Sequence, residues 1–229
     1  MIYITGDTHG EFSRVDEVCD EFKTTREDIL IILGDVGLNY YADFHDENKK
    51  KHLCELPITL FWIHGNHEQR PSNFEAYKEV IWNEGVVYIE KAFPNILFAK
   101  DGEIFDLNGL KTIVIGGAYS VDKFYRIYNN YGWWEDEQPS EEIKQYVEMK
   151  LEQVNWNIDV VLSHTVSLKY EPVEVFIGGI DQSKVDKSTE IWLDSIEKRL
   201  NYKKWYVGHY HTIKKINKLE IMFENFEKF

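Results

Sequence analysis

The chain has 229 residues, the length of one large domain. Asp and Glu number 40 against 26 Lys and Arg, so the formal net charge is −14, and a surface of this sign argues against long duplex DNA as a partner. Two cysteines without C-x-x-C spacing indicate free thiols rather than a disulfide framework. No apolar run approaches the ~18 residues of a membrane span, and a strand pattern begins directly after Met1. We therefore expect a soluble, cytoplasmic protein without a membrane segment.

Short apolar runs recur along the chain and predict strands. Because their residues are apolar on both faces, these strands are expected to be buried between layers. The runs are residues 2–5, 29–33, 58–63, 111–115, 159–162 and 204–207.

Helical patterns lie between some of these runs. Apolar residues in 12–22 recur on one helical face, and Ser13 with Asp16 has the spacing of a capping box. A second helix is predicted over 140–154, and a third over 188–200.

Residues 86–115 contain short strand patterns separated by turn signals, which predicts antiparallel hairpins. Residues 212–224 have the same character. Together with the βαβ units, these patterns predict one α/β domain over 1–229, with two packed mixed sheets flanked by helices. Side chains that follow parallel strands should then gather at the carboxyl ends of those strands.

Two stretches are too long for simple connections. Residues 116–139 are rich in aromatic side chains, and residues 165–187 follow His164. Long structured loops are often functional, so both are expected near the site. The aromatic residues suit either a packed cluster or a wall that stacks on a base or another planar group.

Runs of metal-ligand residues follow the apolar stretches. They are Gly6-Asp7-Thr8-His9-Gly10, Gly34-Asp35, Gly65-Asn66-His67-Glu68, Ser163-His164 and Gly208-His209-Tyr210-His211. Residues two apart on an extended strand point to the same side, so Asp7 and His9 can reach one ion, as can His209 and His211. Apart from Glu68, the runs supply two carboxylates, an amide oxygen and five imidazoles, enough for two adjacent cations.

The order Asp-x-His, Gly-Asp, Gly-Asn-His-Glu, His and Gly-His-x-His resembles the calcineurin-like metallophosphoesterase superfamily. These motifs extend from Asp7 to His211 and so cover almost the whole chain. The resemblance implies a four-layer αββα sandwich. It also implies hydrolysis of a phosphate ester by a hydroxide held between two divalent cations.

The resemblance further implies a set of ligands. One cation would be held by Asp7, His9, Asp35 and His211, and the other by Asp35, Asn66, His164 and His209. Asp35 would bridge the two, and His67 matches the family histidine that approaches the leaving-group oxygen. Sets of His and carboxylate ligands favour Mn, Fe or Zn over Ca or Mg.

The chain departs from one branch of this superfamily. Phosphoprotein phosphatases carry Gly-Asp-x-Val-Asp-Arg-Gly, whereas residues 34–40 lack both the second Asp and the Arg. Asn39 is a candidate for part of the role of that Asp. Arg70 is a candidate phosphate clamp, because a guanidinium matches phosphate oxygens, and Arg126 is a weaker one. His211 is typical of phosphodiesterases and nucleases, although the first and third motifs look more like the phosphatases.

The interpretation that these features favour is a phosphodiesterase acting on a small nucleotide-like or single-stranded substrate. A phosphomonoesterase or phosphoprotein phosphatase is the first alternative. A non-catalytic metal-binding scaffold of the same fold is the second. The sequence does not determine the substrate, the metal or the oligomeric state.

Overall fold

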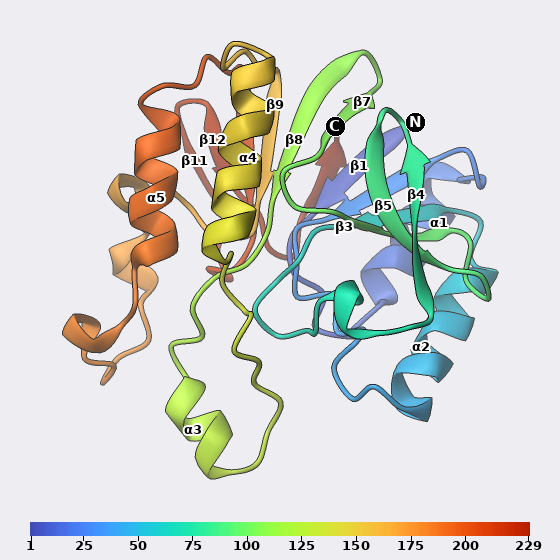
Figure 1. Cartoon of the computed structure of the whole chain (residues 1–229). Helices are drawn as coiled ribbons and strands as arrows, with labels where there is room; N and C mark the ends of the chain where they lie inside the picture. The colour runs from blue at the N-terminus through green and yellow to red at the C-terminus, as the bar shows by residue number, and fades with distance from the viewer.

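Two mixed β-sheets form the centre of the protein, whose computed structural model describes residues 1–229. They pack face to face, and helices cover the outer face of each (Figure 1). This arrangement confirms the expected αββα sandwich with two mixed sheets.

The first sheet has seven strands. In spatial order they are β13 (Phe226–Lys228), β1 (Ile2–Thr5), β2 (Ile29–Ile32), β3 (Thr59–Trp62), β6 (Ile96–Ala99), β5 (Gly85–Glu90) and β4 (Tyr77–Trp82). Strands β1, β2, β3 and β6 run parallel, while β13, β5 and β4 are antiparallel to their neighbours.

The second sheet has six strands. In spatial order they are β11 (Lys214–Ile216), β12 (Leu219–Ile221), β10 (Lys204–Val207), β9 (Val160–Ser163), β8 (Leu110–Ile115) and β7 (Ile104–Leu107). The inner four strands are parallel, and the two edge strands β11 and β7 are antiparallel. The predicted apolar runs form six of the eight parallel strands; β6 and β12, which lie in the stretches expected to be antiparallel hairpins, also pair in parallel with β3 and β10, so that expectation is wrong for these two strands.

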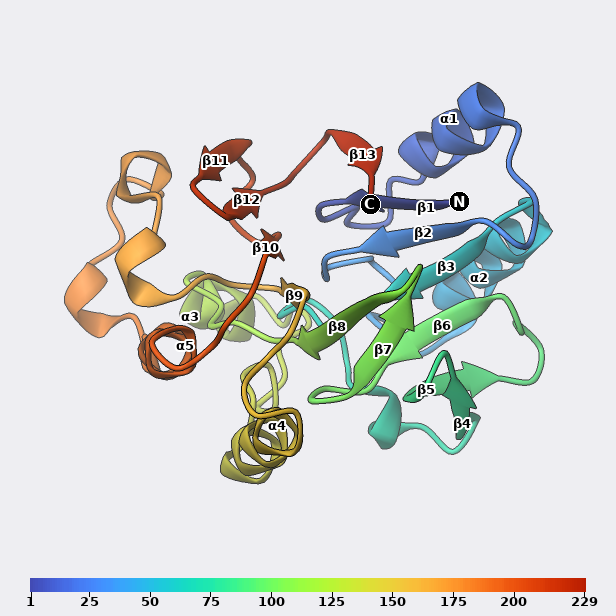
Figure 2. The ribbon, with the colours of Figure 1, turned by 90° about the horizontal axis from the view of Figure 1, so that it is seen from above.

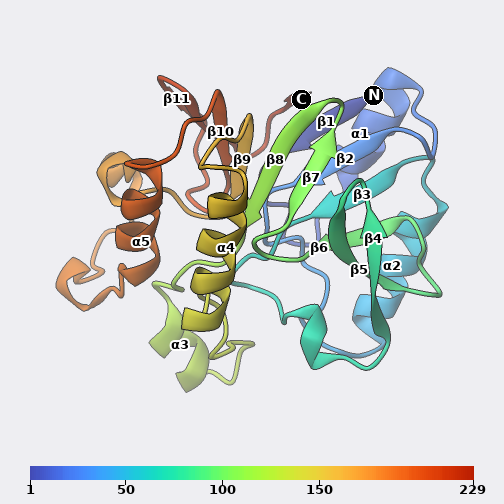
Figure 3. The same cartoon turned by 45° about the horizontal axis from the view of Figure 1, so that its top comes forward.

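Four of the five α-helices form the outer layers. Helices α1 (Ser13–Phe22) and α2 (Phe44–Glu55) cover the first sheet, and α4 (Glu141–Gln153) and α5 (Ser188–Glu197) cover the second (Figures 2 and 3). Helix α3 (Lys123–Tyr128) lies outside these layers, at the lower end of Figure 1. Short 3₁₀ turns occur at Pro71–Asn73, Leu168–Tyr170, Val173–Val175 and Gln182–Lys184.

Three separate apolar clusters fill the spaces between the four layers. Val15 of α1 and Leu53 of α2 pack on the outer face of the first sheet. Val147 of α4 and Leu193 of α5 pack on the second sheet. The third cluster, which includes the fully buried Phe61, lies between the two sheets. Burial on both faces explains why the strands carry continuous apolar runs.

Helix starts agree with the sequence pattern only in part. Ser140 caps α4, because its hydroxyl accepts a hydrogen bond from the Ile143 N–H at 3.3 Å. The expected capping box at Ser13 is wrong: Phe12 occupies the N-cap position of α1, and no side chain caps that helix. No helix in the protein combines the length and apolar character that a bilayer crossing needs.

Candidate metal centre

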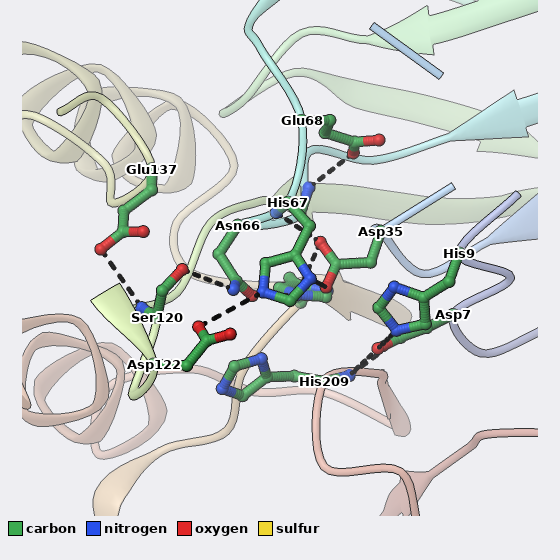
Figure 4. Close-up of polar contacts among 12 residues, drawn as sticks. Asp7, His9, Asp35, Asn66, His67, Glu68, Ser120, Asp122, Glu137 and His209 are labelled. Atoms are coloured by element: carbon green, nitrogen blue, oxygen red, sulfur yellow. Dashed lines mark hydrogen bonds and ion pairs between the residues drawn. The ribbon is translucent and has the colours of Figure 1, made fainter. Parts of the chain in front are cut away.

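The motif residues follow the carboxyl ends of β1, β2, β3, β9 and β10, and their side chains converge at this edge of the two sheets. Potential ligand atoms of three overlapping groups lie within 4.8 Å of one another. These groups are Asp7, His9 and His211; His9, Asp35 and His67; and Asp7, Asp35 and His164. Since Asp7, His9 and Asp35 each belong to two groups, the ligand atoms form one continuous cluster (Figure 4).

Both carboxylates of the cluster are buried and held by the backbone of other motifs. The two oxygens of Asp7, which is 1% exposed, accept from the His209 N–H at 2.9 and 3.0 Å. Oδ1 of Asp35, which is 2% exposed, accepts from the His67 N–H at 2.8 Å. These bonds fix the carboxylates before any cation binds, which lowers the entropy lost on binding.

Two imidazoles meet beside Asp7. Nε2 of His9 lies 2.8 Å from Nε2 of His211, and the latter atom lies 3.4 Å from Oδ2 of Asp7. At most one proton fits between two ring nitrogens at this distance, so at least one lone pair faces the other ring. Two nitrogens and one carboxylate oxygen converging on one point are a suitable donor set for Mn, Fe or Zn.

His164 and Asn66 form the other side of the cluster. Nδ1 of His164 donates to the Leu33 carbonyl at 2.7 Å, which leaves Nε2 facing Oδ1 of Asn66 at 2.9 Å and Oδ1 of Asp35 at 3.6 Å. The Asn66 amide donates to Oγ of Ser120 at 2.9 Å, which turns its oxygen toward the cluster. Outer partners of this kind orient metal ligands in proteins.

Several candidate ligands have an uncommon backbone conformation. The φ angles of His9, Asp35, His209 and His211 are 48°, 47°, 67° and 47°, all in the left-handed region. A non-glycine residue there costs of order 1–3 kcal/mol, and such residues concentrate at functional sites. The strain turns each side chain back toward the cluster directly after its strand.

Gly65 and Gly208 allow the loops after β3 and β10 to approach the carboxylates of Asp35 and Asp7 closely. A Cβ atom at Gly65 would lie 2.0 Å from Oδ1 of Asp35, and one at Gly208 would lie 2.2 Å from Oδ1 of Asp7. The same Cβ atoms would lie 2.2 Å from the backbone N of Asp35 and 2.6 Å from the Leu33 carbonyl oxygen, so no side chain fits at either position unless the backbone also shifts. The glycines are therefore part of the geometry of the site.

The charges of the cluster depend on its burial and on its own pairs. Burial alone would raise the pKa of Asp35, but the charges of His67 and His164 outweigh it and hold the pKa well below its usual range. Burial lowers the pKa of His164, yet Asp35 outweighs this effect and raises it to about 9. Burial lowers the pKa of His209 to about 3, so this imidazole stays neutral. Ionised carboxylates beside a neutral imidazole suit a divalent cation. In the metal-free protein, the proton on His164 supplies part of the positive charge that a bound cation would supply, and binding would release it.

His67 lies at the edge of this cluster and contacts helix α3. Nη2 of Arg126 lies 3.1 Å from its Nδ1, and Oδ1 of Asp122 lies 3.9 Å from its Nε2. Arg126 also donates from Nε to Oδ2 of Asp122 at 2.8 Å (the Asp122 carboxylate is labelled in Figure 4). Arg126 is a candidate from the sequence, whereas Asp122 is not, because its only signal there is its spacing of four residues from Arg126.

Arg70 and Asn39 are engaged elsewhere. Nη1 of Arg70 pairs with Oδ2 of Asp101 at 2.6 Å, and its Nε donates to the Asp136 carbonyl at 2.9 Å. Oδ1 of Asn39 accepts from the Tyr77 hydroxyl at 2.9 Å. Neither residue borders the cavity at the metal centre, so the structure does not bring them together with the other site residues.

Glu68 has a role that the sequence analysis did not assign. Its carboxylate accepts from the Gly65 N–H at 2.8 Å and from the Val36 N–H at 3.2 Å, which ties the loop after β3 to the loop after β2. Burial, together with the charge of Asp35, raises its pKa to about 8. The last residue of the Gly-Asn-His-Glu run therefore joins two ligand loops.

An αββα sandwich with a cluster of Asp, His and Asn between its sheets defines a class of protein with a candidate two-metal centre. The sequence profile of the Calcineurin-like phosphoesterase family matches residues 1–212. The chain therefore belongs to the calcineurin-like phosphoesterase family, which confirms the resemblance of its motifs.

Solved structures with the same fold are distant in sequence. TT1561 of Thermus thermophilus, known from a crystal structure, shares 12% sequence identity with this chain. The two structures match with a TM-score of 0.52 over 97% of this chain and 87% of that chain. A second crystal structure is 17% identical, with a TM-score of 0.52 and coverage of 96% and 88%. At these identities the likeness supports the fold alone. No curated protein sequence gives a significant match.

Proposed function

We propose that this protein is a metal-dependent phosphoesterase that prefers a small phosphodiester. The observation that carries the proposal is the convergence of the family ligand residues into one cluster around two buried carboxylates, with His67 at its edge. A scaffold that had lost activity would be expected to lack ligands or this histidine, and this chain retains all of them.

The donor set suits two divalent cations, with Mn, Fe or Zn favoured. Asp7, His9, Asp35 and His211 would hold one, and Asp35, Asn66, His164 and His209 would hold the other. When bound, such cations acidify water and neutralise charge on the phosphoryl oxygens.

His67 is positioned to act on the leaving group. Because a guanidinium only donates, Nδ1 of His67 accepts from Arg126 at 3.1 Å, and the proton of the neutral ring resides on Nε2. Burial lowers the pKa of His67, which favours this neutral form. The Nε2–H group is then a hydrogen-bond donor for the leaving-group oxygen, on which negative charge develops.

The charges around the cavity favour a diester over a monoester. None of the 17 residues that border the cavity at the metal centre is Lys or Arg, and Asp122, Glu171 and Glu190 are among them. A diester carries one negative charge at neutral pH, whereas a monoester carries nearly two. The side-chain cations nearest to the cavity, Arg126 and Lys187, are already paired with Asp122 and Glu171, so the extra charge of a monoester finds no free side-chain cation, which favours the diester.

A phosphomonoesterase is the alternative that the first and third motifs support. Hydrolysis of bis-p-nitrophenyl phosphate and of p-nitrophenyl phosphate by the Mn²⁺-loaded protein separates the two. We expect faster cleavage of the diester, and a decrease of about 10²–10⁴-fold in kcat for His67→Ala, the usual range for loss of proton-transfer catalysis. Faster monoester cleavage would overturn the diesterase preference. No turnover of either ester by the protein with two metals bound would indicate a scaffold, or a pocket too narrow for both esters.

A further inference from the structure

A cavity of about 370 Å³ opens beside the metal centre. On one side it is bordered by the candidate ligands and by His67, where the proposed reaction takes place. The remaining border comes from three parts of the chain: residues 119–122, residues 171–190 and Tyr210. In Figure 1 the segment 165–187, in orange, and α3 both lie toward the lower left of the molecule. The volume falls within the usual range for sites that bind small molecules.

Most of the side chains beyond the metal centre are apolar. They are Tyr119, Val121, Val175, Phe176, Ile177, Ile180, Val185 and Tyr210. The rings of Phe176 and Tyr210 are nearly parallel, 14° apart, with centroids separated by 6.5 Å. Ile177 is 63% exposed although it borders the cavity, so its apolar surface faces water unless a ligand covers it. A flat apolar group would bury this surface.

One polar group in the cavity wall lacks a partner. Glu190 of α5 is 5% exposed, and its Oε1 accepts from Oγ1 of Thr165 at 2.8 Å. Its Oε2 is buried and makes no hydrogen bond. A buried acceptor without a partner is costly, and an N–H group on a ligand would satisfy it.

The other carboxylates at the cavity are already paired. Glu171 forms an ion pair with Lys187 at 2.7 Å, and Asp122 forms one with Arg126 at 2.8 Å. With no Lys or Arg bordering the cavity itself, a second phosphate group of a substrate would find no ammonium or guanidinium group there to pair with. The cavity therefore opposes nucleoside diphosphates and oligonucleotides that extend into it.

We propose that this cavity binds the non-phosphate part of the substrate, and that this part is a flat, uncharged ring with an N–H donor, of the nucleobase class. The inference rests on the proposed phosphoesterase function, since the ring would be joined to the phosphate at the metal centre. The proposed substrate carries a single phosphate group, and Glu190 and Ile177 contribute to the selection of this substrate.

Calorimetric titration of the Mn²⁺-loaded protein with adenosine, cytidine and thymidine tests ring binding without requiring turnover. We expect saturable binding of at least one of these nucleosides, weakened at least tenfold by Ile177→Lys. Ile81→Lys is the matched control, because Ile81 is 72% exposed and does not border the cavity. No saturable binding, or equal binding by the Ile177→Lys variant, would overturn the inference. The proposed function would survive that outcome if bis-p-nitrophenyl phosphate is still hydrolysed.

Kinetics test the restriction to one phosphate. The p-nitrophenyl ester of thymidine 5′-phosphate is compared with the same compound carrying an additional 3′-phosphate. We expect the extra phosphate to lower kcat/KM at least tenfold in the wild-type protein and less in Ile177→Lys, where a lysine offers a partner. Equal kcat/KM values for the two esters in the wild-type protein would contradict the charge selection.

Discussion

His67 is flanked by two charged residues that come from a different part of the chain than the family pattern suggests. In the phosphoprotein phosphatases, the motif after the second strand supplies an Asp and an Arg, and residues 34–40 lack both. Asp122 and Arg126 at helix α3 provide the same two side-chain types next to His67. The sequence alone did not reveal this, because the pair is separated from His67 by more than 50 residues and carries no family motif.

We therefore expect Asp122 and Arg126 to position His67. Asp122→Asn should lower kcat about 10-fold or more, because the carboxylate beside Nε2 and the partner of Arg126 are both lost. KM and the number of bound Mn²⁺ ions should change little. Steady-state kinetics with bis-p-nitrophenyl phosphate and metal analysis test this expectation, with the exposed Asp20→Asn as control. An unchanged kcat, or loss of metal together with activity, would rule out a positioning role.

The motif glycines give a second test at the scale of single residues. Gly65→Ala places a Cβ atom 2.0 Å from Oδ1 and 2.2 Å from the backbone N of Asp35, so this candidate ligand must move. We expect weaker Mn²⁺ binding and a loss of about 1–3 kcal/mol in the free energy of unfolding, as for other overpacked sites. Gly178→Ala is the matched control, because nothing lies within 4 Å of the added atom. Calorimetry and urea denaturation measure both effects, and equal behaviour of the two variants would contradict the assignment.

The candidate ligand residues could be recognised in the sequence because they stand directly after strand patterns. Arg70 is a residue for which prediction from local sequence fails. Its position after Glu68 suggested a phosphate clamp, but its guanidinium pairs with Asp101, 31 residues away. Residue type and local spacing indicate what a side chain is able to bind. Residue type and local spacing do not indicate which distant residue the side chain contacts in the folded protein.

Secondary elements were predictable where an apolar pattern marks them. Six of the eight parallel strands were predicted almost to the residue, whereas β6 and β12 lie in stretches that were expected to be antiparallel hairpins, and helix α2 was not predicted. This helix buries Asp46 and Lys50, which are polar, so its sequence lacks an apolar stripe. Asp46 accepts from the Tyr41 and Ala42 N–H groups, and Lys50 pairs with Glu90 of β5. The apolar periodicity of a sequence does not show which charged residues will be buried against partners that are distant in the chain.

Glu190 of helix α5 is expected to make the stability of the folded protein depend on pH. Burial raises the pKa of Glu190 from its ordinary 4.5 to about 7, so the folded state binds this proton more tightly than the unfolded state. Its contribution to stability is therefore full below pH 4.5 and is lost as the pH rises through about 7. The shift corresponds to roughly 3 kcal/mol.

Urea denaturation of the metal-free protein at pH 5 and pH 8 measures this effect. We expect Glu190→Gln, which cannot ionise, to gain stability relative to the wild-type protein between these two pH values. The gain should approach roughly 3 kcal/mol if the carboxyl is fully buried in its ionised form. A difference between the two proteins that is the same at both pH values would show that Glu190 ionises freely.

At the scale of the whole molecule, the two sheets bring together loops that are distant in sequence. Asp7 and His209 are 202 residues apart, yet the backbone of one holds the side chain of the other. The alternation of strands and helices predicted an α/β sandwich with its ligands at the strand ends. Patterns local to the chain did not predict that β13 would pair with β1, or that α3 would stand outside the layers next to His67.

The central claim is that five loops from two sheets form one two-metal site around Asp35. Anomalous diffraction from crystals soaked in Mn²⁺ tests it most directly. We expect two peaks about 3.5–4 Å apart, the usual separation in two-metal phosphoesterase sites, with the Asp35 carboxylate between them. A single peak, no peak, or peaks away from Asp35 would contradict the account.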